Sequence, residues 1–333
     1  MLYKKVKNAI VNCYLCPHYC SIKPDERGKC GVRENTDGTL YSLVFGTLCA
    51  RSVDPIEKKP FFHFLPDSKS YSIATVGCNL TCSFCQNWRI SQMPHDYGPI
   101  TGEETTPEEV VQDAIAHGCK SISYTYTEPT IFFEFAYETA KLAREEGLLN
   151  TFVTNGYTTK EAIDTISPYL DAVNVDLKGF TEEFYHNVCG GRLRPVEDAI
   201  RQYHDNGVWV EVTTLLVSGH NDSKFMLDQM ADFIVSIDAA IPWHISRFHP
   251  SYKMRDAEPT KISTIHKAVE IGRQHGIKYI YSGNVPGDDY ESTFCPECGA
   301  KVISRSGFYT IKNNLTEGAC PSCGKKIDGV MHV

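Results

Sequence analysis

The chain has 333 residues, 42% of them hydrophobic and 22% charged, so it is long enough to bury a large core. Its formal net charge of −8 argues against nucleic acid or an anionic membrane surface as its main partner. No apolar run approaches the ~18 residues of a membrane span, and the N-terminal apolar stretch is too short for a secretion signal. We therefore expect a cytoplasmic protein.

The fourteen cysteines are concentrated in three groups, and only Cys49, Cys119 and Cys189 lie outside them. In a reducing compartment, such groups are typical of metal ligands rather than disulfides. The three groups are Cys13, Cys16, Cys20 and Cys30; Cys78, Cys82 and Cys85; and Cys295, Cys298, Cys320 and Cys323.

Residues 1–50 form the first predicted unit, a turn-rich segment that is too small to build a sizeable core without a metal. Its four cysteines could hold zinc or an auxiliary four-iron cluster, and His18 could replace one of the four ligands. Zinc is the preferred interpretation, because small turn-rich segments often need only a metal staple.

Residues 51–290 form the second predicted unit, in which strand-like runs alternate with helical stretches. The predicted strands are 71–76, 121–127, 150–154, 172–177, 208–217, 243–248 and 278–281, and the predicted helices are 107–117, 131–146, 160–169, 196–206, 223–237 and 262–275. Repeated strand–helix units predict an α/β fold with a parallel sheet, either doubly wound or rolled into a full or partial barrel. Ligands would then bind at the carboxyl ends of the strands.

The triplet Cys78, Cys82 and Cys85 directly follows the first of these strands. A four-iron cluster uses one thiolate per iron, and a structural zinc site also needs four ligands. The spacing C-x3-C-x2-C supplies only three, and neither His63 nor His95 is at knuckle spacing. The triplet therefore suits a four-iron cluster with one iron open to a ligand that is not the protein. The alternative is a chance grouping of cysteines on one loop, or a disulfide and a spare thiol.

This triplet, with Phe84 just before its third cysteine, resembles the signature of the radical S-adenosylmethionine (radical SAM) superfamily. The resemblance implies a [4Fe-4S] cluster whose open iron binds SAM, which the reduced cluster cleaves to methionine and a 5′-deoxyadenosyl radical. It also implies that Phe84 lies near the adenine, and Asn87 matches the activase branch of the superfamily. The implied fold is a partial (β/α)6 barrel of the TIM type.

Two further strand ends resemble cofactor-binding segments of this superfamily. The stretch "YTYTEPT" resembles the "GGEP" segment, with Thr127 where glycine is common and with Glu128 in place to accept a hydrogen bond from the methionyl ammonium. The stretch "FVTNG" is similar to the "DTNG" of pyruvate formate-lyase activating enzymes. That similarity implies cofactor contacts from Thr154 and Asn155.

The strand end "NVDLKG" matches the activase "DLK", and Asp176 and Lys178 share a face because they are two residues apart on a strand. Lys178 would pair with the methionyl carboxylate and Asp176 with the ribose or ammonium; the alternative is a surface ion pair. In "HISRFHP", His249 resembles a histidine that touches the cofactor, although a lone strand-end histidine is as often structural. Cys189 is a candidate radical relay or thiol donor, but a plain cysteine is the preferred interpretation.

Residues 291–333 form the third predicted unit, which resembles a zinc ribbon. Its two knuckles, "CPECG" and "CPSCG", are separated by the 21 residues between Cys298 and Cys320. A glycine after the second cysteine of each knuckle allows backbone N–H groups to face the sulfurs. A closed cage of four thiolates suits a structural zinc ion better than a single iron or a pair of disulfides.

Motifs over nearly the whole chain, including "DPIEKKPFFHFLP", "VCGGR" and "GNVPG", resemble those of the AmmeMemoRadiSam system radical SAM enzymes. This resemblance implies AMMECR1-like and Memo-like partner proteins, and the chemistry requires a reduced electron donor such as flavodoxin or ferredoxin. The implied activity is hydrogen abstraction from a substrate, either a protein, by analogy with the activases, or a small molecule. The alternative is a metal-binding interaction module with zinc-held ends and a catalytically idle barrel.

Overall fold

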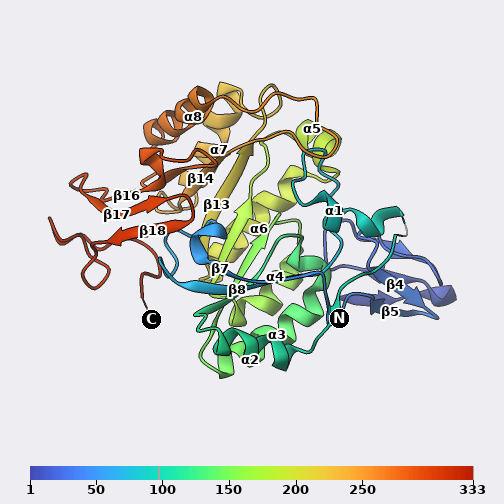
Figure 1. Cartoon of the computed structure of the whole chain (residues 1–333). Coiled ribbons are helices and arrows are strands. Elements are labelled where there is room, and N and C mark those ends of the chain that lie inside the picture. The colour runs from blue at the N-terminus through green and yellow to red at the C-terminus, as the bar shows by residue number, and fades with distance from the viewer. Residues whose placement is uncertain (97, 333) are drawn as a thin grey trace.

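The computed structural model describes residues 1–96 and 98–332, and it is built around one eight-stranded sheet (Figure 1). The strand order is β15-β14-β13-β12-β11-β10-β8-β7. All neighbours pair in parallel except β7 and β8, which are antiparallel. The strands are β7 (Ala50–Pro55), β8 (Lys69–Ala74), β10 (Ser121–Tyr124), β11 (Leu149–Thr154), β12 (Ala172–Asp176), β13 (Trp209–Leu216), β14 (Trp243–Arg247) and β15 (Ile280–Gly283).

The seven strands predicted from the sequence are present in the predicted order, and each crossover between the parallel strands carries helix. The main helices are α2 (Pro107–Ala116), α3 (Phe133–Glu145), α4 (Lys160–Ile166), α6 (Leu193–Asp205), α7 (Lys224–Val235) and α8 (Ile262–Gln274). Helix α2 begins where predicted, because Thr106 caps it just before Pro107 and forms a reciprocal capping box with Glu109 in the first turn. No helix among the described residues is both long enough and apolar enough to cross a bilayer.

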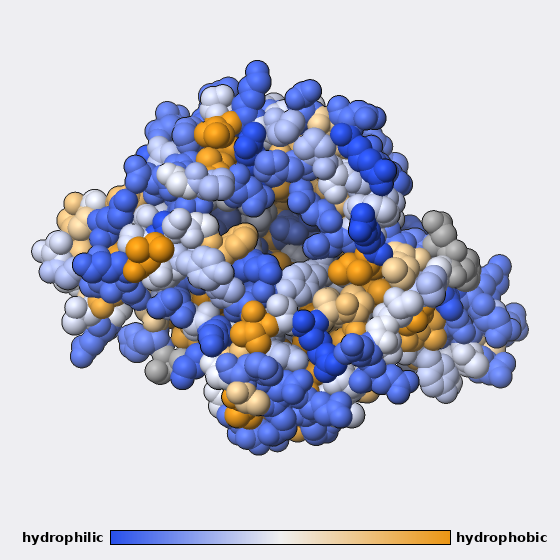
Figure 2. All heavy atoms as spheres, in the orientation of Figure 1, coloured by the Kyte–Doolittle hydropathy of each residue, from blue (hydrophilic) through white to orange (hydrophobic). Residues whose placement is uncertain are grey.

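The sheet is an incomplete barrel, because β7 and β15 form its two edges and do not pair with each other. The parallel α/β core therefore agrees with the predicted partial barrel. Strands β8, β10, β11, β12, β13 and β14 are each followed by a helix, and β15 adds a seventh parallel strand after these six strand–helix units. The antiparallel edge strand β7 was not predicted from the sequence. The face of the molecule in Figure 2 is hollowed near its centre, and mostly hydrophilic residues surround the hollow.

Small sheets form the two ends of the chain, which lie on opposite sides of the central sheet in Figure 1. The N-terminal part contains β1 (Tyr3–Lys5), β2 (Val11–Cys13) and β3 (Ser21–Ile22), and the hairpin of β4 (Arg33–Thr36) and β5 (Thr39–Ser42). Strand β6 (Thr47–Leu48) pairs with β9 (Glu103–Glu104). The C-terminal part contains β16 (Thr293–Phe294), β17 (Lys301–Ser306) and β18 (Tyr309–Asn313).

A buried carboxylate, Glu211 on β13, anchors the segment 56–66 against the barrel. Its oxygens accept hydrogen bonds from the backbone N–H groups of Phe62 (3.1 Å) and His63 (2.8 Å) and lie 2.6 Å from His244 Nε2. Arg305 of the C-terminal part donates in turn to the carbonyl oxygen of Phe62 at 2.9 Å. The segment 56–66 thereby joins the C-terminal part to the barrel.

We predict that Glu211→Gln destabilises the protein by about 1–3 kcal/mol, because the amide would face buried N–H donors that then lack an acceptor. Burial raises the pKa of Glu211, but its hydrogen bond with His244 and its other partners outweigh this, so the net pKa lies below the ordinary value of 4.5. A carboxyl group whose pKa is lower in the folded than in the unfolded protein stabilises the fold above about pH 4.5. This stabilisation is lost as the pH falls through the pKa that the group has in the folded protein. The variant should therefore lose less stability than wild type on acidification below about pH 4.5.

Urea unfolding at neutral pH and at mildly acidic pH measures both effects. Glu258→Gln is the matched control, because Glu258 is exposed. An unfolding free energy for Glu211→Gln equal to that of the control would contradict the anchoring role.

Candidate functional site

A cavity of about 260 Å³ opens at the carboxyl ends of the parallel strands and brings together residues distant in the sequence. Parallel strands end at one edge of the sheet, so the loops that follow them converge there. The cavity is lined by the cysteine triplet and by Leu80, Phe84, Gln86, Asn87, Ser91, Gln92, Tyr126, Thr127, Asn155, Asp176, Lys178, Thr213, Leu215, Ser246 and Asn284.

The cysteine triplet lies on the loop between β8 and the short helix α1 (Trp88–Ser91). The sulfur of Cys78 accepts the backbone N–H of Leu80 at 3.4 Å and the side-chain amide of Asn155 at 3.6 Å. The hydroxyl of Ser91 lies 3.2 Å from the sulfur of Cys85. Hydrogen bonds of this kind stabilise thiolates, the form in which cysteine binds metals.

The three sulfurs of the triplet are spread more widely than the four C-terminal sulfurs. Among the residues that the structure describes, only the C-terminal cysteines form a group of three or more candidate ligands whose ligand atoms all lie within 4.8 Å of one another. A cluster takes one thiolate per iron and so separates its ligand sulfurs more widely than a single ion does. The triplet therefore has the donor atoms and the adjoining cavity that such a cluster requires.

Asp176 and Lys178 lie at the end of β12 on the wall of this cavity. The ammonium of Lys178 lies 2.8 Å from the Asp176 carboxylate and 5.9 Å from the centre of the Phe84 ring. Burial alone lowers the pKa of Lys178, but the negative charges of Asp176 and Cys82 outweigh burial and raise it well above its ordinary value. Lys178 therefore offers a fixed positive charge to an anionic group of a ligand.

Glu128 is fully buried behind the cavity wall, where four donors surround its carboxylate. It accepts hydrogen bonds from the backbone N–H of Thr130 (3.0 Å) and of Asn155 (2.7 Å). The hydroxyls of Thr130 (2.6 Å) and Thr154 (2.7 Å) donate to it as well. Burial raises the pKa of Glu128, and these donors offset part of the rise. In this structure Glu128 orients Thr154 and Asn155, and of these three only Asn155 lines the cavity.

The remaining predicted cofactor residues differ in their placement. Asn87 and Thr127 line the cavity, where the Asn87 amide donates to the carbonyl oxygen of Tyr126 at 2.7 Å. The side chain of His249 is exposed. The backbone carbonyl of His249 accepts a hydrogen bond from the side-chain amide of Gln86, in the loop of the cysteine triplet, at 3.3 Å. The structure therefore does not bring the His249 side chain to the cavity wall.

Cys189 lies behind the triplet rather than on the cavity wall. It ends a π-helical turn, Tyr185–Cys189, whose carbonyl oxygens accept the backbone N–H groups of Thr81 (2.8 Å) and Ser83 (2.9 Å). Its buried thiol contacts that of Cys82, and this hydrogen bond lowers the pKa of Cys82, whereas burial raises the pKa of Cys189 well above its ordinary value. Cys189 is therefore placed to support the triplet loop from behind.

Sequence reasoning missed several cavity residues: Tyr126, Thr213, Ser246 and Asn284. Tyr126, Ser246 and Asn284 lie at or just after strand ends, a position that the parallel-sheet prediction had marked for inspection, whereas Thr213 lies within β13. Tyr126 and Asn284 also have positive φ angles of 62° and 59°, which no sequence motif signalled.

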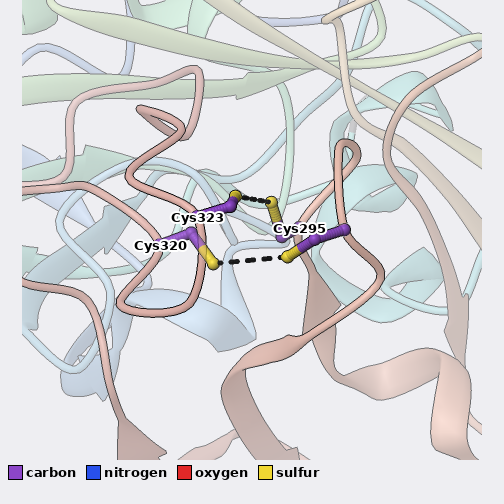
Figure 3. A group of neighbouring side chains, drawn as sticks. Cys295, Cys320 and Cys323 are labelled. Atoms are coloured by element: carbon purple, nitrogen blue, oxygen red, sulfur yellow. Dashed lines mark hydrogen bonds between the residues drawn. The ribbon is translucent and has the colours of Figure 1, made fainter.

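The four C-terminal cysteines converge on one point from two facing knuckles (Figure 3). The sulfurs of Cys295 and Cys323 are 3.6 Å apart, and those of Cys298 and Cys320 are 3.7 Å apart. Four sulfurs in a tetrahedron about 2.3 Å from one ion would be about 3.8 Å apart. This group is therefore suited to a single tetrahedral metal ion.

Comparisons with known proteins agree with this geometry. The family model described as the radical SAM superfamily matches residues 72–234. The chain is 45% identical over 334 residues to "Uncharacterized protein MJ0808" of Methanocaldococcus jannaschii, covering 99% of each chain. It is 25% identical over 199 residues to the pyruvate formate-lyase-activating enzyme of Clostridium pasteurianum, covering 55% of this chain and 81% of that one.

Among solved structures, the fold is similar to that of a radical SAM methyltransferase from Sphaerobacter thermophilus, with a TM-score of 0.53 and 19% identity over 66% of this chain and 68% of that one. The fold and the family match thus define an enzyme of an iron–sulfur class with a partial α/β barrel. The chain belongs to the radical SAM superfamily, and it resembles the activating enzymes within it.

We predict that Lys178→Met weakens binding of SAM by about tenfold or more, which corresponds to about 1.4 kcal/mol for one lost charge–charge contact. Anaerobic equilibrium binding of SAM to the cluster-loaded protein measures this change. Because Lys178 is not a metal ligand, the iron content should stay at the wild-type value.

Lys160→Met is the matched control, since Lys160 is exposed and forms an ion pair with Asp164 on its own helix. Unchanged SAM affinity in Lys178→Met would show that the Asp176–Lys178 pair is structural.

Proposed function

We propose that this radical SAM enzyme acts on a polypeptide substrate. The observation that carries the proposal is the similarity to relatives named as pyruvate formate-lyase-activating enzymes, whose target is a protein. The strand-end cavity of about 260 Å³ agrees with it, because the cofactors alone would fill that volume. A cluster and SAM would occupy this space, so the substrate has to approach from outside. A side chain or backbone segment presented by a polypeptide meets that requirement.

The cofactors fit residues that already face the cavity. Cys78, Cys82 and Cys85 would hold three irons of a [4Fe-4S] cluster and leave the fourth for SAM. When bound, these groups supply a 5′-deoxyadenosyl radical that removes a hydrogen atom from the substrate. Lys178 would bind the SAM carboxylate, and Asp176, held by Lys178, would accept from the ribose or ammonium.

Asn155 would act at the interface of the cluster and SAM. Its amide donates to the sulfur of Cys78 at 3.6 Å and to the side chain of Asn79 at 2.8 Å, and its backbone is held by Glu128. Phe84 would lie against the adenine, next to the Lys178 ammonium. These residues would hold SAM in one orientation and narrow the access of water to it.

The place of this enzyme in an AmmeMemoRadiSam system is part of the same proposal. It rests on the resemblance of motifs over the whole chain. Its partners would be AMMECR1-like and Memo-like proteins and a reduced flavodoxin or ferredoxin. The oxygen-sensitive cluster and unpaired thiols suit a reducing compartment such as the cytoplasm.

The test of the activity is release of 5′-deoxyadenosine by anaerobically reconstituted, reduced protein. We predict release by wild type and none by Cys85→Ala, because the variant lacks a cluster ligand. Cys119→Ala is the control, since Cys119 is a buried cysteine outside the three groups and should leave release intact. Equal release by wild type and Cys85→Ala would exclude the triplet as the reactive site.

The test of the substrate class uses deuterated candidates. Transfer of deuterium into 5′-deoxyadenosine from uniformly labelled AMMECR1-like or Memo-like protein would support a polypeptide substrate. Transfer only from a labelled extract of molecules below the size of a peptide would overturn it in favour of a small molecule.

We also propose that the C-terminal group holds structural zinc in a ribbon-like module. The support is the sulfur spacing, which matches a tetrahedral zinc site. We predict that Cys298→Ala lowers the zinc content by about one ion per chain and makes the C-terminal part sensitive to protease, because this part contributes few buried apolar side chains, and these share one small cluster with Phe62, Tyr279 and Tyr281. Zinc analysis and limited proteolysis measure this, and wild-type zinc content in the variant would contradict it.

A further inference from the structure

The four N-terminal cysteines line a single small, mainly apolar cavity. Its other lining residues are His18, Lys29, Arg33, Thr130 and the apolar residues Leu15, Ile22, Gly28 and Ile131. Each of the four sulfurs accepts a backbone N–H group. The donors are Leu15 to Cys13, His18 to Cys16, Lys29 to Cys20 and Val32 to Cys30. Four thiols that face one enclosed space and carry one such donor each are arranged as metal ligands.

A buried arginine adds positive charge beside this cavity. Arg33 is 2% exposed; two of its nitrogens donate to Glu134 at 2.8 and 2.7 Å, and one of these also donates to the carbonyl oxygen of Met1. Its Nε is buried and has no hydrogen-bond partner. An unpaired donor on a buried cation favours an anionic occupant, which four thiolates around a metal centre would supply.

The sulfurs of this group are spread more widely than those of the C-terminal group. The structure describes all four residues, and no three of their sulfurs all lie within 4.8 Å of one another. The four sulfurs of the C-terminal group do lie within that distance of one another. In this respect the N-terminal group resembles the triplet, whose three sulfurs likewise do not all lie within 4.8 Å of one another. A wider spread of this kind agrees with a cluster, which takes one thiolate per iron. The N-terminal group differs from the triplet in offering four thiols, so a four-iron cluster there would have no open iron.

His18 connects this cavity to the triplet through a chain of hydrogen bonds. Its backbone N–H donates to the sulfur of Cys16, and its ring Nε2 donates to the carbonyl oxygen of Asn79 at 2.7 Å. The same peptide group, between Asn79 and Leu80, donates its N–H to the sulfur of Cys78 at 3.4 Å. One side chain and one peptide group therefore link a sulfur of each cysteine group.

The two groups also meet through the backbone at Gly77. A side chain there would lie 2.8 Å from Val32 Cγ1 and 3.3 Å from the carbonyl oxygen of Cys30. The residue before the first cysteine of the triplet thus packs directly against the last cysteine of the N-terminal group. No layer of solvent separates the two sites at this point.

From these contacts we propose that the N-terminal module holds a second [4Fe-4S] cluster, which passes electrons to the cluster of the triplet through His18 and the Asn79–Leu80 peptide. The relay rests on the proposed function, whereas the second cluster does not. A one-electron protein donor reduces the N-terminal cluster from the 2+ to the 1+ state. That electron then reduces the triplet cluster, and the N-terminal cluster returns to 2+; no bond is made or broken at the N-terminal site.

Metal content of the anaerobically reconstituted full chain tests the second cluster. We expect about eight iron, eight sulfide and one zinc per chain in wild type. A variant with Cys78, Cys82 and Cys85 all replaced by alanine should keep about four iron, now held by the N-terminal group alone. About four iron and two zinc in wild type would overturn the proposal in favour of a structural zinc.

The Cys16→Ala, Cys20→Ala double variant provides the reciprocal measurement. It should keep about four iron at the triplet, and this retained cluster shows in the same sample that the barrel is folded. If the double variant fails to fold, the triplet variant and the wild-type iron count still decide the question. If a folded double variant had the same iron content per chain as wild type, the proposal of an N-terminal cluster would likewise be overturned.

The relay is tested by the rate at which the triplet cluster becomes reduced, followed by freeze-quench electron paramagnetic resonance without SAM or substrate. With reduced flavodoxin as donor, His18→Phe should lose the fast phase of reduction, because phenylalanine keeps a ring but removes the donor to Asn79. His18→Gln can still donate a hydrogen bond to the carbonyl oxygen of Asn79, so this variant should retain most of the fast phase of reduction. With titanium(III) citrate, a small reductant that reaches the cavity directly, all three proteins should be reduced at the same rate.

The outcomes separate the relay from the proposed function. A wild-type rate with flavodoxin in His18→Phe would overturn the relay, and so would equal slowing with both reductants, which would indicate damage to the triplet site. Reduction of both clusters without release of 5′-deoxyadenosine would count against the proposed function and leave the relay standing.

Discussion

The position of the cysteine loop depends on the close approach of two backbones at Gly77. This residue has a φ of 107°, and its missing side chain leaves room for Val32 and for the carbonyl of Cys30. Any other residue would both strain the backbone and push the N-terminal part away from the barrel. Because the triplet begins at the next residue, this contact positions the cluster loop between the strand that precedes it and the N-terminal module.

The hydrogen bonds around this loop come from behind as well as from the cavity. The turn that ends at Cys189 accepts the N–H groups of Thr81 and Ser83, and Asn79 is held by Asn155 and by the carbonyl of Tyr157. Glu128 in turn holds Asn155, so a buried carboxylate that does not touch the cavity controls a residue that does. Preorganisation of this kind allows the loop to keep three thiols apart and directed to one space.

Much of this arrangement could be predicted from the sequence because it is local. Strand and helix periodicity marked the seven parallel strands, and the spacing of Cys78, Cys82 and Cys85 marked the reactive loop. The edge strand β7 was missed because its pairing depends on β8 and not on its own pattern. The motif around Glu128 predicted a contact with the cofactor. It could not predict the four hydrogen-bond donors of this carboxylate, because they come from the ends of two neighbouring strands that converge only in the folded protein.

His18 shows the same limit more sharply. In the sequence it lies between Cys16 and Cys20 and is a natural candidate for a metal ligand, yet in the structure its Nε2 is directed at Asn79, a residue 61 positions away. Spacing describes which ligands can share a metal, but it carries no information about which two metal sites adjoin each other. That relation is set by the tertiary contact at Gly77.

The two ends of the barrel consequently have different roles. At the amino end, the segment 56–66 is buried against Glu211 and carries the C-terminal part, whose compact cysteine group resembles a structural site. At the carboxyl end, the widely spaced thiols, the Asp176–Lys178 pair and the cavity are all gathered. If electrons arrive through the N-terminal module, they enter from the side of the loop that faces away from the cavity. The cavity mouth is then left to SAM and the substrate, so reduction and hydrogen abstraction need not compete for the same surface.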